Sequence, residues 1–325
     1  MSLGFHAPSW HSGLPTGADY NCRMRTPYRW QLRSRTLELG ERTLIMGVVN
    51  VTPDSFSDGG QYLDPQRAVE GALRMVEEGA DIVDIGGEST RPGTRVLNAE
   101  RGEQPAVSQE EELRRLVPVL QGVLRARGDT MIAVDTYKAG VARVVVGEGA
   151  EIVNDVSGFQ WDPLMAETCG ELKCGVVVMH TRGRPAEWRT LAREADIVSA
   201  VEHALAERLR VALEHGVERR RIVVDPGFGF GKDFEENYAL LAHFDRLHRA
   251  GFPLLAGTSR KGFIGRAVGQ RVGRDTAPDQ RLFGSLAAMV TCILKGAHVV
   301  RVHDVKATVE AAAVADEVLR VERQH

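Results

Sequence analysis

The sequence predicts a (β/α)8 TIM barrel, in which eight parallel strands are surrounded by helices, with an N-terminal β-hairpin before it. Short apolar runs rich in β-branched residues recur along the 325-residue chain and alternate with helix-like stretches. Near-continuous apolar runs are typical of parallel strands buried on both faces. Roughly eight strand–helix units fit the usual size of this barrel. A doubly wound open sheet is the structural alternative, and the number of units favours the barrel.

The composition is that of an ordinary globular protein. Hydrophobic residues make up 43% and charged residues 26% of the chain, which excludes disordered and fibrous classes. The formal net charge is -3, so we expect no nucleic-acid partner bound through bulk charge. No run approaches the ~18 consecutive apolar residues of a membrane span. Four cysteines without paired spacing favour neither a disulfide framework nor a zinc site and indicate a reducing cytoplasm.

The N-terminal segment has a different character from the rest. Residues 1–29 mix Gly, Pro, His and Arg without apolar periodicity, and we expect a flexible extension before a single barrel domain over residues 30–325. Alternation begins in Trp30–Leu39, breaks at Gly40 and runs on into Leu44–Val51. This pattern predicts a hairpin that leads into the first buried strand.

The expected strands are short and apolar, and the helices between them carry apolar residues at helical spacing. The strands are predicted at Leu44–Val51, Asp81–Gly87, Met131–Thr136, Ile152–Ser157, Gly175–His180, Ile222–Gly227, Pro253–Ser259 and His298–His303. The helices are predicted at Pro65–Glu78, Glu110–Arg127, Lys138–Glu148, Val198–His215, Glu235–Arg249, Gln280–Lys295 and Lys306–Val321. Such alternation is the pattern of repeated βαβ units.

Each apolar run ends in polar or charged residues for which a hydrophobic core has no use. In strand order these are Asn50, Glu88 to Arg91, Asp135, Asn154 with Asp155, His180, Asp225, Ser259 to Lys261, and Arg301 with His303. The C-terminal strand ends of a (β/α)8 barrel meet at one face, where active sites lie. A single such residue could be structural, as Asp135 would be if it capped the next helix. Because all eight strands agree, the sequence predicts an active site at this face.

One corner of that face is expected to bind an anion. Because the last strand of a closed barrel lies beside the first, Arg301 and His303 should converge on Asn50. Barrels often bind phosphate after strands seven and eight, at a helix N-terminus. Asp304 is expected to cap the last helix, so that its amides face the anion together with Arg301. The neutral oxygen of Asn50 suits Mg²⁺ shared with phosphate oxygens. The corner therefore predicts a pyrophosphate site with magnesium, while a structural role for His303 stays open.

The opposite side of the mouth is expected to bind a planar heterocycle. Asp135, Asn154, Asp225 and Lys261 come from four different strands. A carboxylate can accept two parallel N–H bonds from an amino-pyrimidinone edge, as it does from Arg. Lys261 can donate to a ring carbonyl and offset the negative charge. A purely structural Asp–Lys pair is the alternative.

Three connections have unusual sequences. Thr52–Gly60 is turn-rich, and Ser89–Gly93 precedes a long charged stretch, so both are expected to act as lids over the site. Asp225–Lys232 has a Gly-x-Gly-x-Gly rhythm, but its spacing is not that of a dinucleotide-binding fingerprint. Its glycines let the backbone approach a flat ligand, and Phe228 or Phe230 would offer an apolar wall.

Eight short motifs occur in order between about Trp30 and Val321. They are Asn50–Asp58, Gly86–Gly93, Asp135–Lys138, Asn154–Asp155, Met179–His180, Asp225–Lys232, Thr258–Lys261 and Arg301–Val305. In these motifs the chain resembles the dihydropteroate synthases, folate-pathway enzymes of the pterin-binding family that sulfonamides inhibit. The resemblance implies that it joins 6-hydroxymethyl-7,8-dihydropterin diphosphate to 4-aminobenzoate and releases pyrophosphate. It also implies a homodimer with small-molecule substrates.

The resemblance further implies roles for the predicted site residues. Mg²⁺ would be bound by Asn50. The diphosphate would be held by Thr90, Arg301 and His303. The pterin would be held by Asp135, Asn154, Asp225 and Lys261, with Asp225 on the amino-pyrimidinone edge. The aminobenzoate would be bordered by Pro92, Phe230 and Ser259, and Val302 completes the substrate-binding set.

The implied reaction needs no nucleophilic side chain, because the electron-rich pterin ring stabilises the cation that forms as pyrophosphate leaves. Catalysis is then electrostatic, through Asp135 and Lys261 at the pterin and through Arg301 and His303 at the leaving group. Arg91 and Asp54 are expected to complete the catalytic set when the lids close and exclude water.

Two other functions stay open. A pterin-binding methyltransferase module would need neither the diphosphate corner nor the lid after the first strand. A non-catalytic pterin-binding paralogue would be expected to have lost Asn50, Lys261 or Arg301, and all are present. The chain departs from the family pattern at Thr181 and Gly262–Phe263, and in a stretch from Thr94 to Ser108 that is longer than usual.

Overall fold

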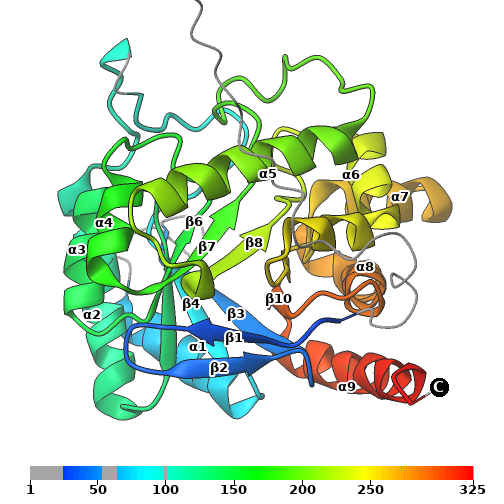
Figure 1. Ribbon diagram of the computed structural model, residues 1–325, viewed down its shortest axis with the longest axis horizontal. Helices are drawn as coiled ribbons and strands as arrows, with labels where there is room; N and C mark the ends of the chain where they lie inside the picture. Colours follow the sequence, from blue (N-terminus) through cyan, green and yellow to red (C-terminus); the bar gives the residue numbers. More distant parts are fainter. Residues whose placement is uncertain (1–24, 53–63, 99–100, 275, 325) are drawn as a thin grey trace, which may run out of the picture.

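Eight parallel strands form a barrel with the helices outside it, so the predicted fold is confirmed (Figure 1). The computed structural model describes residues 25–52, 64–98, 101–274 and 276–324. The strand order is β8-β7-β6-β5-β4-β3-β10-β9. A parallel bridge between Val224 and Leu254 joins the two ends of this sheet. The last strand, β10, pairs with β3 as closure requires, with Arg301 opposite Met46.

The eight barrel strands lie within the predicted ranges, and β1 begins two residues before the predicted hairpin. They are β1 Tyr28–Gln31, β2 Thr36–Leu39, β3 Leu44–Asn50, β4 Ile82–Gly86, β5 Met131–Asp135, β6 Ile152–Asp155, β7 Gly175–Met179, β8 Ile222–Asp225, β9 Leu255–Ala256 and β10 Val299–Val302. The antiparallel pair β1–β2 forms the expected N-terminal hairpin. Its turn lies between Gln31 and Thr36, within the stretch Trp30–Leu39 that alternates in sequence, whereas the predicted break was at Gly40.

The helices also follow the prediction, with three differences. They are α1 Pro65–Glu77, α2 Gln109–Ala126, α3 Ala139–Gly147, α4 Met165–Leu172, α5 Ile197–Glu214, α6 Phe234–Ala242, α7 Gly262–Val272, α8 Leu282–Leu294 and α9 Val305–Glu322. The helix expected over Glu235–Arg249 is divided into α6 and a 3-10 segment, Phe244–Ala250. Neither α4 nor α7 was among the predicted helices. The first has only 8 residues, and α7 contains Gly262, Gly265 and Gly269, which lower helix propensity.

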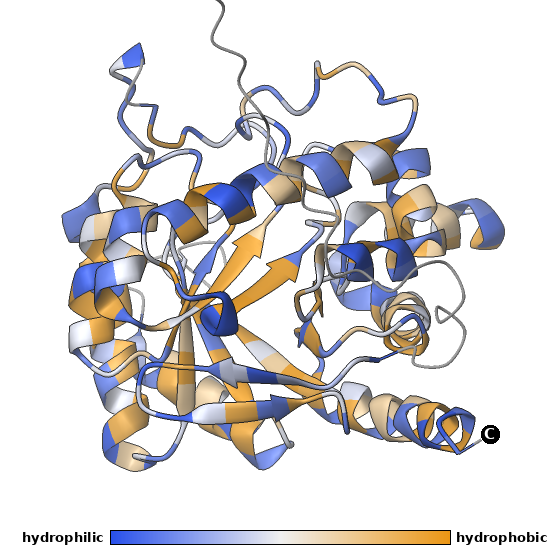
Figure 2. Cartoon of the chain, viewed as in Figure 1, coloured by the Kyte–Doolittle hydropathy of each residue, from blue (hydrophilic) through white to orange (hydrophobic). Residues whose placement is uncertain are grey.

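Alternation along the strands separates two layers of side chains. Met46, Ile82, Ala133 and Val177 lie in an inner cluster, while their strand neighbours pack outward against the helices. The hairpin closes the lower end of the barrel with Trp30, whose Nε1 donates to the Arg221 carbonyl at 2.8 Å. Figure 2 shows the resulting apolar strands enclosed by helices of mixed polarity. Apolar residues therefore fill the lower barrel, and inward polar residues remain near the C-terminal face.

The folded unit already includes residues before the expected boundary at Trp30. Arg25 is buried, and its guanidinium pairs with Asp316 of α9 at 2.9 Å. Strand β1 begins at Tyr28. Most of the predicted flexible extension, residues 1–24, lies outside the described residues. No helix in the described part of the chain is long and apolar enough to cross a membrane.

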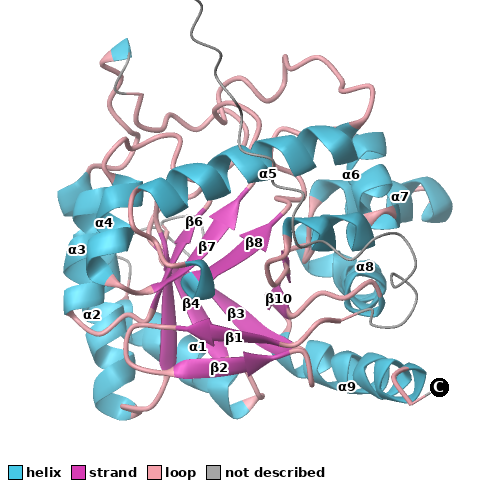
Figure 3. Ribbon diagram, viewed as in Figure 1, coloured by secondary structure: helices cyan, strands magenta, loops and turns pink. Residues whose placement is uncertain are grey.

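Two long connections extend over the C-terminal end of the barrel. Figure 3 shows them as loops at the top, one between β4 and α2 and the other between β7 and α5. The first includes the Ser89–Gly93 motif and the lengthened stretch after it. The second, residues 180–196, was not singled out from the sequence.

Candidate active site

A pocket of about 960 Å³ opens at the C-terminal face of the barrel. Its lining includes most of the predicted site residues, namely Asn50, Thr90, Arg91, Pro92, Asp135, Phe230, Ser259, Lys261, Arg301 and His303. Asn154 and Asp225 are buried at the ends of β6 and β8 on the same face. Asp54 lies outside the described residues. Residues from the ends of seven different strands therefore share one mouth.

Arg301 joins two carboxylates across the barrel. Its Nε donates to Asp84 Oδ2 at 2.6 Å, and its Nη2 donates to Asp135 Oδ2 at 2.8 Å. Asn154 Nδ2 donates to the same Asp84 oxygen at 3.0 Å. Arg301 was predicted to belong to the diphosphate corner, and in the structure its guanidinium also pairs with the acidic side of the mouth. The network links strands β4, β5, β6 and β10 directly.

Asp84 is the site residue that the sequence analysis missed. Its side chain is fully buried, and Oδ1 has no hydrogen-bond partner among the described residues. An unsatisfied buried carboxylate oxygen costs free energy, which a ligand N–H or a bound water would offset. The signal was present: an acid in the middle of the apolar run Ile82–Gly86, at a position that alternation directs inward. Asp84 lies inside its strand, whereas the predicted site residues lie at or beyond the strand ends.

Val302, predicted to belong to the substrate-binding set, turns its side chain away from the pocket. Arg301 and His303 face the barrel mouth, so alternation turns the residue between them outward. Val302 is accordingly buried in the outer core between the strands and the helices. Its backbone is the part that a substrate could reach.

The expected diphosphate corner contains His303, Ser259 and Asn50. His303 N–H donates to Ser259 Oγ at 3.3 Å, and His303 Nδ1 lies 3.1 Å from the same oxygen. When Ser259 Oγ donates to Nδ1, the ring proton of neutral His303 lies on Nε2. Burial lowers the pKa of His303 to about 3, and Arg301 adds to this effect. His303 is therefore a neutral imidazole with one ring N–H.

Asp304 occupies the N-cap position of α9, but its side chain does not make the cap hydrogen bond that the sequence predicts. Its side chain makes no cap hydrogen bond to α9 within the described residues. Arg260 binds it instead, with Nη2 donating at 2.6 Å and Nε at 3.1 Å. The bidentate geometry of a guanidinium with a carboxylate is stronger than a single cap bond to an amide. Arg260 has φ 59°, a left-handed conformation that a tertiary contact of this kind can hold in place.

Asn50 stands at the end of β3, close to the Arg301 network. Gly86 of β4 faces both Asn50 and Asp135. A Cβ atom placed on Gly86 would lie 3.9 Å from Asn50 Oδ1 and 3.5 Å from Asp135 Cβ, so the two side chains are near each other. No group of three or more His, Cys, Asp or Glu in the described ranges could hold a metal by itself. One neutral oxygen at the mouth suits a metal ion that takes its other ligands from water and phosphate, as Mg²⁺ does.

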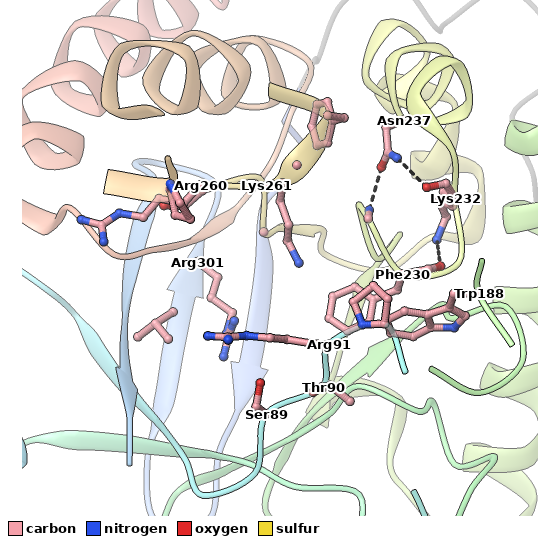
Figure 4. A pocket seen from close by; sticks show the side chains of 18 of the residues that line it. Ser89, Thr90, Arg91, Trp188, Phe230, Lys232, Asn237, Arg260, Lys261 and Arg301 are labelled. Carbon is pink, nitrogen blue, oxygen red and sulfur yellow. Dashed lines mark hydrogen bonds between the residues drawn. The ribbon is translucent and has the colours of Figure 1, made fainter. Parts of the chain in front are cut away.

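Phe230 and Lys261 form another wall (Figure 4). The Lys261 ammonium lies 4.1 Å from the centroid of the Phe230 ring, and burial lowers its pKa to about 8. Phe228, the other aromatic considered, is buried in the core against Phe244 and Phe263. The loop that carries Phe230 is held from below by Lys232, whose Nζ donates to the Gly227 carbonyl at 2.7 Å.

The pH dependence of turnover should have two limbs. Burial raises the pKa of Asp135 to about 7, against the opposing effect of Arg301. Below that pH the neutral acid cannot stabilise a cation, and above about 8 Lys261 loses its charge. For the pterin substrate that the resemblance implies, we expect kcat/KM to rise and then fall between about pH 6 and 9. In Asp135→Asn the acidic limb should disappear, and a profile identical to that of the wild type would contradict this assignment.

Comparison with known proteins gives a consistent result. The model of the family "Pterin binding enzyme" matches residues 46–303. The dihydropteroate synthase of Synechocystis is 40% identical over 281 residues, which cover 86% of this chain and 92% of that protein. The structure of Xanthomonas albilineans dihydropteroate synthase with 4-aminobenzoic acid has 43% identity and a TM-score of 0.78, covering 90% of this chain and 98% of that one.

The same Xanthomonas albilineans enzyme in complex with 7,8-dihydropteroate has a TM-score of 0.75 and 41% identity, covering 89% of this chain and 98% of that one. The family match spans the barrel from β3 to His303, and so includes all the strand ends that line the pocket. The chain therefore belongs to the pterin-binding enzymes and, within them, to the dihydropteroate synthase family.

Proposed function

We propose that this chain condenses 6-hydroxymethyl-7,8-dihydropterin diphosphate with 4-aminobenzoate to give 7,8-dihydropteroate and pyrophosphate. The observation that carries the proposal is the single pocket in which an acidic side and a corner suited to an anion meet at Arg301. Relatives whose structures contain 4-aminobenzoic acid or 7,8-dihydropteroate support the same substrates. A substrate with a flat ring that develops positive charge, and with an anionic leaving group, fits both sides at once.

The acidic side would bind and activate the pterin. Asp225 is buried and accepts from the Gly227 N–H at 2.7 Å through Oδ1, and its carboxylate offers an acceptor for the amino-pyrimidinone edge. Lys261, above Phe230, would donate to the ring. Asp135, when ionised, would stabilise the positive charge that develops on the pterin as the C–O bond to the diphosphate breaks.

The leaving group would be stabilised at the opposite corner. His303 as a neutral Nε2–H donor, Arg301 and Thr90 would bind diphosphate oxygens, which accept charge as pyrophosphate departs. We propose that Asn50 holds Mg²⁺ there, and the ion would supply Lewis-acid neutralisation of the pyrophosphate. Because Arg301 also binds Asp84 and Asp135, it would fix the distance between the two halves of the site.

The amine would then attack the methylene carbon. Pro92, Phe230 and Ser259 would position the aminobenzoate, and the close fit would favour the amine over water. The amine nitrogen forms the new C–N bond and loses one proton to solvent, while pyrophosphate leaves with the C–O electron pair. Arg91 lines this side of the pocket, and we propose that it acts on the bound substrates together with Asp54.

Release of pyrophosphate tests the function directly. The purified full-length chain should release pyrophosphate when the pterin diphosphate, 4-aminobenzoate and Mg²⁺ are all present. It should release little when any one is omitted, and dihydropteroate should form in equal amount. Release without 4-aminobenzoate would indicate hydrolysis instead of condensation, and no release with all three would refute the proposal.

Asp225→Asn should weaken pterin binding, because the amide loses the charge and one of its two acceptor oxygens. The expected loss is about 1–3 kcal/mol, the usual cost of a broken charged hydrogen bond. Titration calorimetry with a pterin analogue measures it.

Asp155→Asn is the matched control for that variant. Asp155 is equally buried at the end of β6, but its carboxylate accepts from the N–H groups of Ser157 and Phe159 in a loop. Its replacement should affect stability and leave pterin affinity unchanged. Equal losses in both variants would mean that the Asp225 effect is structural.

We also propose that the chain forms a homodimer through α7 and α8. Among the large apolar side chains that the structure describes, Phe283 of α8 is 83% exposed and Val272 of α7 is 54% exposed. Exposed aromatic residues of this kind are enriched at protein interfaces. Light scattering should give twice the chain mass for the wild type, and Phe283→Glu should shift it towards the monomer. A monomeric wild type would rule the proposal out.

A further inference from the structure

Trp188 lies in the pocket wall on the β7–α5 connection, and the proposed reaction has assigned it no role. It is partly buried and lines the pocket together with Phe230. The two rings meet edge to face, with centroids 5.3 Å apart and an interplanar angle of 81°. Figure 4 shows the indole beside Phe230, away from Lys261. Phe230 is thus contacted by a cation from one direction and by an indole from another.

The segment that carries Trp188 is fixed to the loop that carries Phe230. Arg182 donates through Nη1 to the Gly231 carbonyl at 3.2 Å and to Glu236 Oε1 at 3.1 Å. The same Glu236 oxygen accepts from the Glu194 N–H at 2.7 Å. These bonds tie both ends of the β7–α5 connection to the first turn of α6. The two ends of the segment that carries the indole are therefore fixed to the loop that carries Phe230 and to α6.

The same connection also holds the loop after β4. The Gly93 N–H donates to the Pro185 carbonyl at 2.8 Å, and Arg184 Nε donates to the Leu97 carbonyl at 3.4 Å. Val96 is buried and Leu97 is partly buried in a small apolar cluster that also includes Phe230. The lengthened stretch after Gly93 is thus anchored at its start. As a result, the β7–α5 connection holds both sides of the position proposed for the amine, namely the loop with Pro92 and the loop with Phe230.

The indole also carries an uncompensated cost. Trp188 Nε1 is buried and has no hydrogen-bond partner among the described residues. An unsatisfied buried donor destabilises the folded state, and a phenyl ring at this position would avoid that cost. We therefore infer that the indole contributes to function through the shape that it gives the pocket.

We propose that Trp188 is a specificity-determining residue that sets the size of the aromatic amine the site accepts. This inference rests on the proposed function, since the ligand is the 4-aminobenzoate class of that reaction. The indole fills the space beside Phe230, on a support shared with Pro92, and so limits the width available to a benzoate ring. A smaller side chain leaves space beside Phe230 and allows that ring to shift.

The test compares two amines in the wild type, Trp188→Ala and Trp188→Phe. The amines are 4-aminobenzoate and 4-amino-2-chlorobenzoate, and pyrophosphate release is the readout. Trp188→Ala should raise KM for 4-aminobenzoate by about tenfold, while KM for the pterin diphosphate stays within about twofold. In the same variant, kcat/KM for 4-amino-2-chlorobenzoate divided by kcat/KM for 4-aminobenzoate should rise by about fivefold or more. Trp188→Phe, with a side chain of intermediate size, should raise this ratio less than Trp188→Ala does, and it should be at least as stable to heat as the wild type.

Thr190→Ala is the control, because it removes one local bond of the same connection, from Thr190 Oγ1 to the Glu187 carbonyl at 2.9 Å, and leaves the indole in place. Its selectivity ratio should match that of the wild type. An unchanged ratio in Trp188→Ala, or an equal change in Thr190→Ala, would overturn the inference. If Trp188→Ala does not fold, Trp188→Leu provides the same comparison. A wild type that turns over neither amine would refute the proposed function, whereas a wild type that is active and shows no Trp188 effect would refute this inference alone.

Discussion

Arg301→Met should lower both turnover and stability by large amounts. Loss of one preorganised electrostatic group at a leaving anion typically reduces kcat by about 100- to 1,000-fold. The variant also leaves Asp84 and Asp135 buried without the cation that binds both. Breaking a buried ion pair in this way costs about 3–5 kcal/mol. Pyrophosphate release measures the first effect, and urea unfolding measures the second.

A second substitution separates the two effects of Arg301→Met. Asp84→Asn in the same chain removes one of the carboxylates that the first change left unpaired, and Asn154 can still donate to its oxygen. The double variant should regain much of the lost stability and remain inactive. If Arg301→Met kept both stability and turnover, the Asp84–Arg301–Asp135 network would have no part in the function. If the double variant recovered turnover, the role of Arg301 would be structural.

Lys261→Met should abolish most turnover without weakening the fold. Burial lowers the pKa of Lys261 to about 8, so the folded state pays for keeping this ammonium charged and a neutral side chain relieves that cost. The same charge would be needed at the pterin. We expect kcat/KM to fall by about 100-fold or more and the urea midpoint to stay the same or rise.

Lys232→Met provides a contrast within the same pocket. Burial lowers the pKa of Lys232 to about 7, but its ammonium donates to the carbonyls of Gly227, Phe230 and His180 at 2.7, 3.3 and 3.4 Å. Its loss leaves three carbonyls without that donor, so stability should fall by about 1–3 kcal/mol. If Lys261→Met proved the less stable of the two, the assignment of Lys261 to the substrate would be wrong.

The fold could be predicted because its signals are local. Buried parallel strands are apolar throughout, and the number of strand–helix units distinguishes a barrel from an open sheet. Alternation then puts Asp135, Asn154 and Arg301 on the inner face of their strands. The same rule applied to β4 would have added Asp84 to the predicted site residues. Applied to β10, it places the Val302 side chain on the outer face of the barrel.

The remaining differences depend on contacts between distant segments. Asp304 binds Arg260, 44 residues earlier, and no local pattern predicts this preference over a helix cap. Trp188 lies in a connection with no motif, and its position follows from Arg182 and Glu236, which lie 54 residues apart. Interactions of this kind are determined by the tertiary structure, so a single sequence cannot rank them.

The most direct test of the central claim is a crystal structure with the dihydropterin diphosphate and Mg²⁺ bound. We expect the pterin ring to lie between Asp225, Asp135 and Lys261. The diphosphate and the metal ion should lie at Asn50 and His303, with Arg301 between the ring site and the diphosphate site. Density for the ring outside this mouth, or for a diphosphate that contacts neither Asn50 nor His303, would contradict this claim.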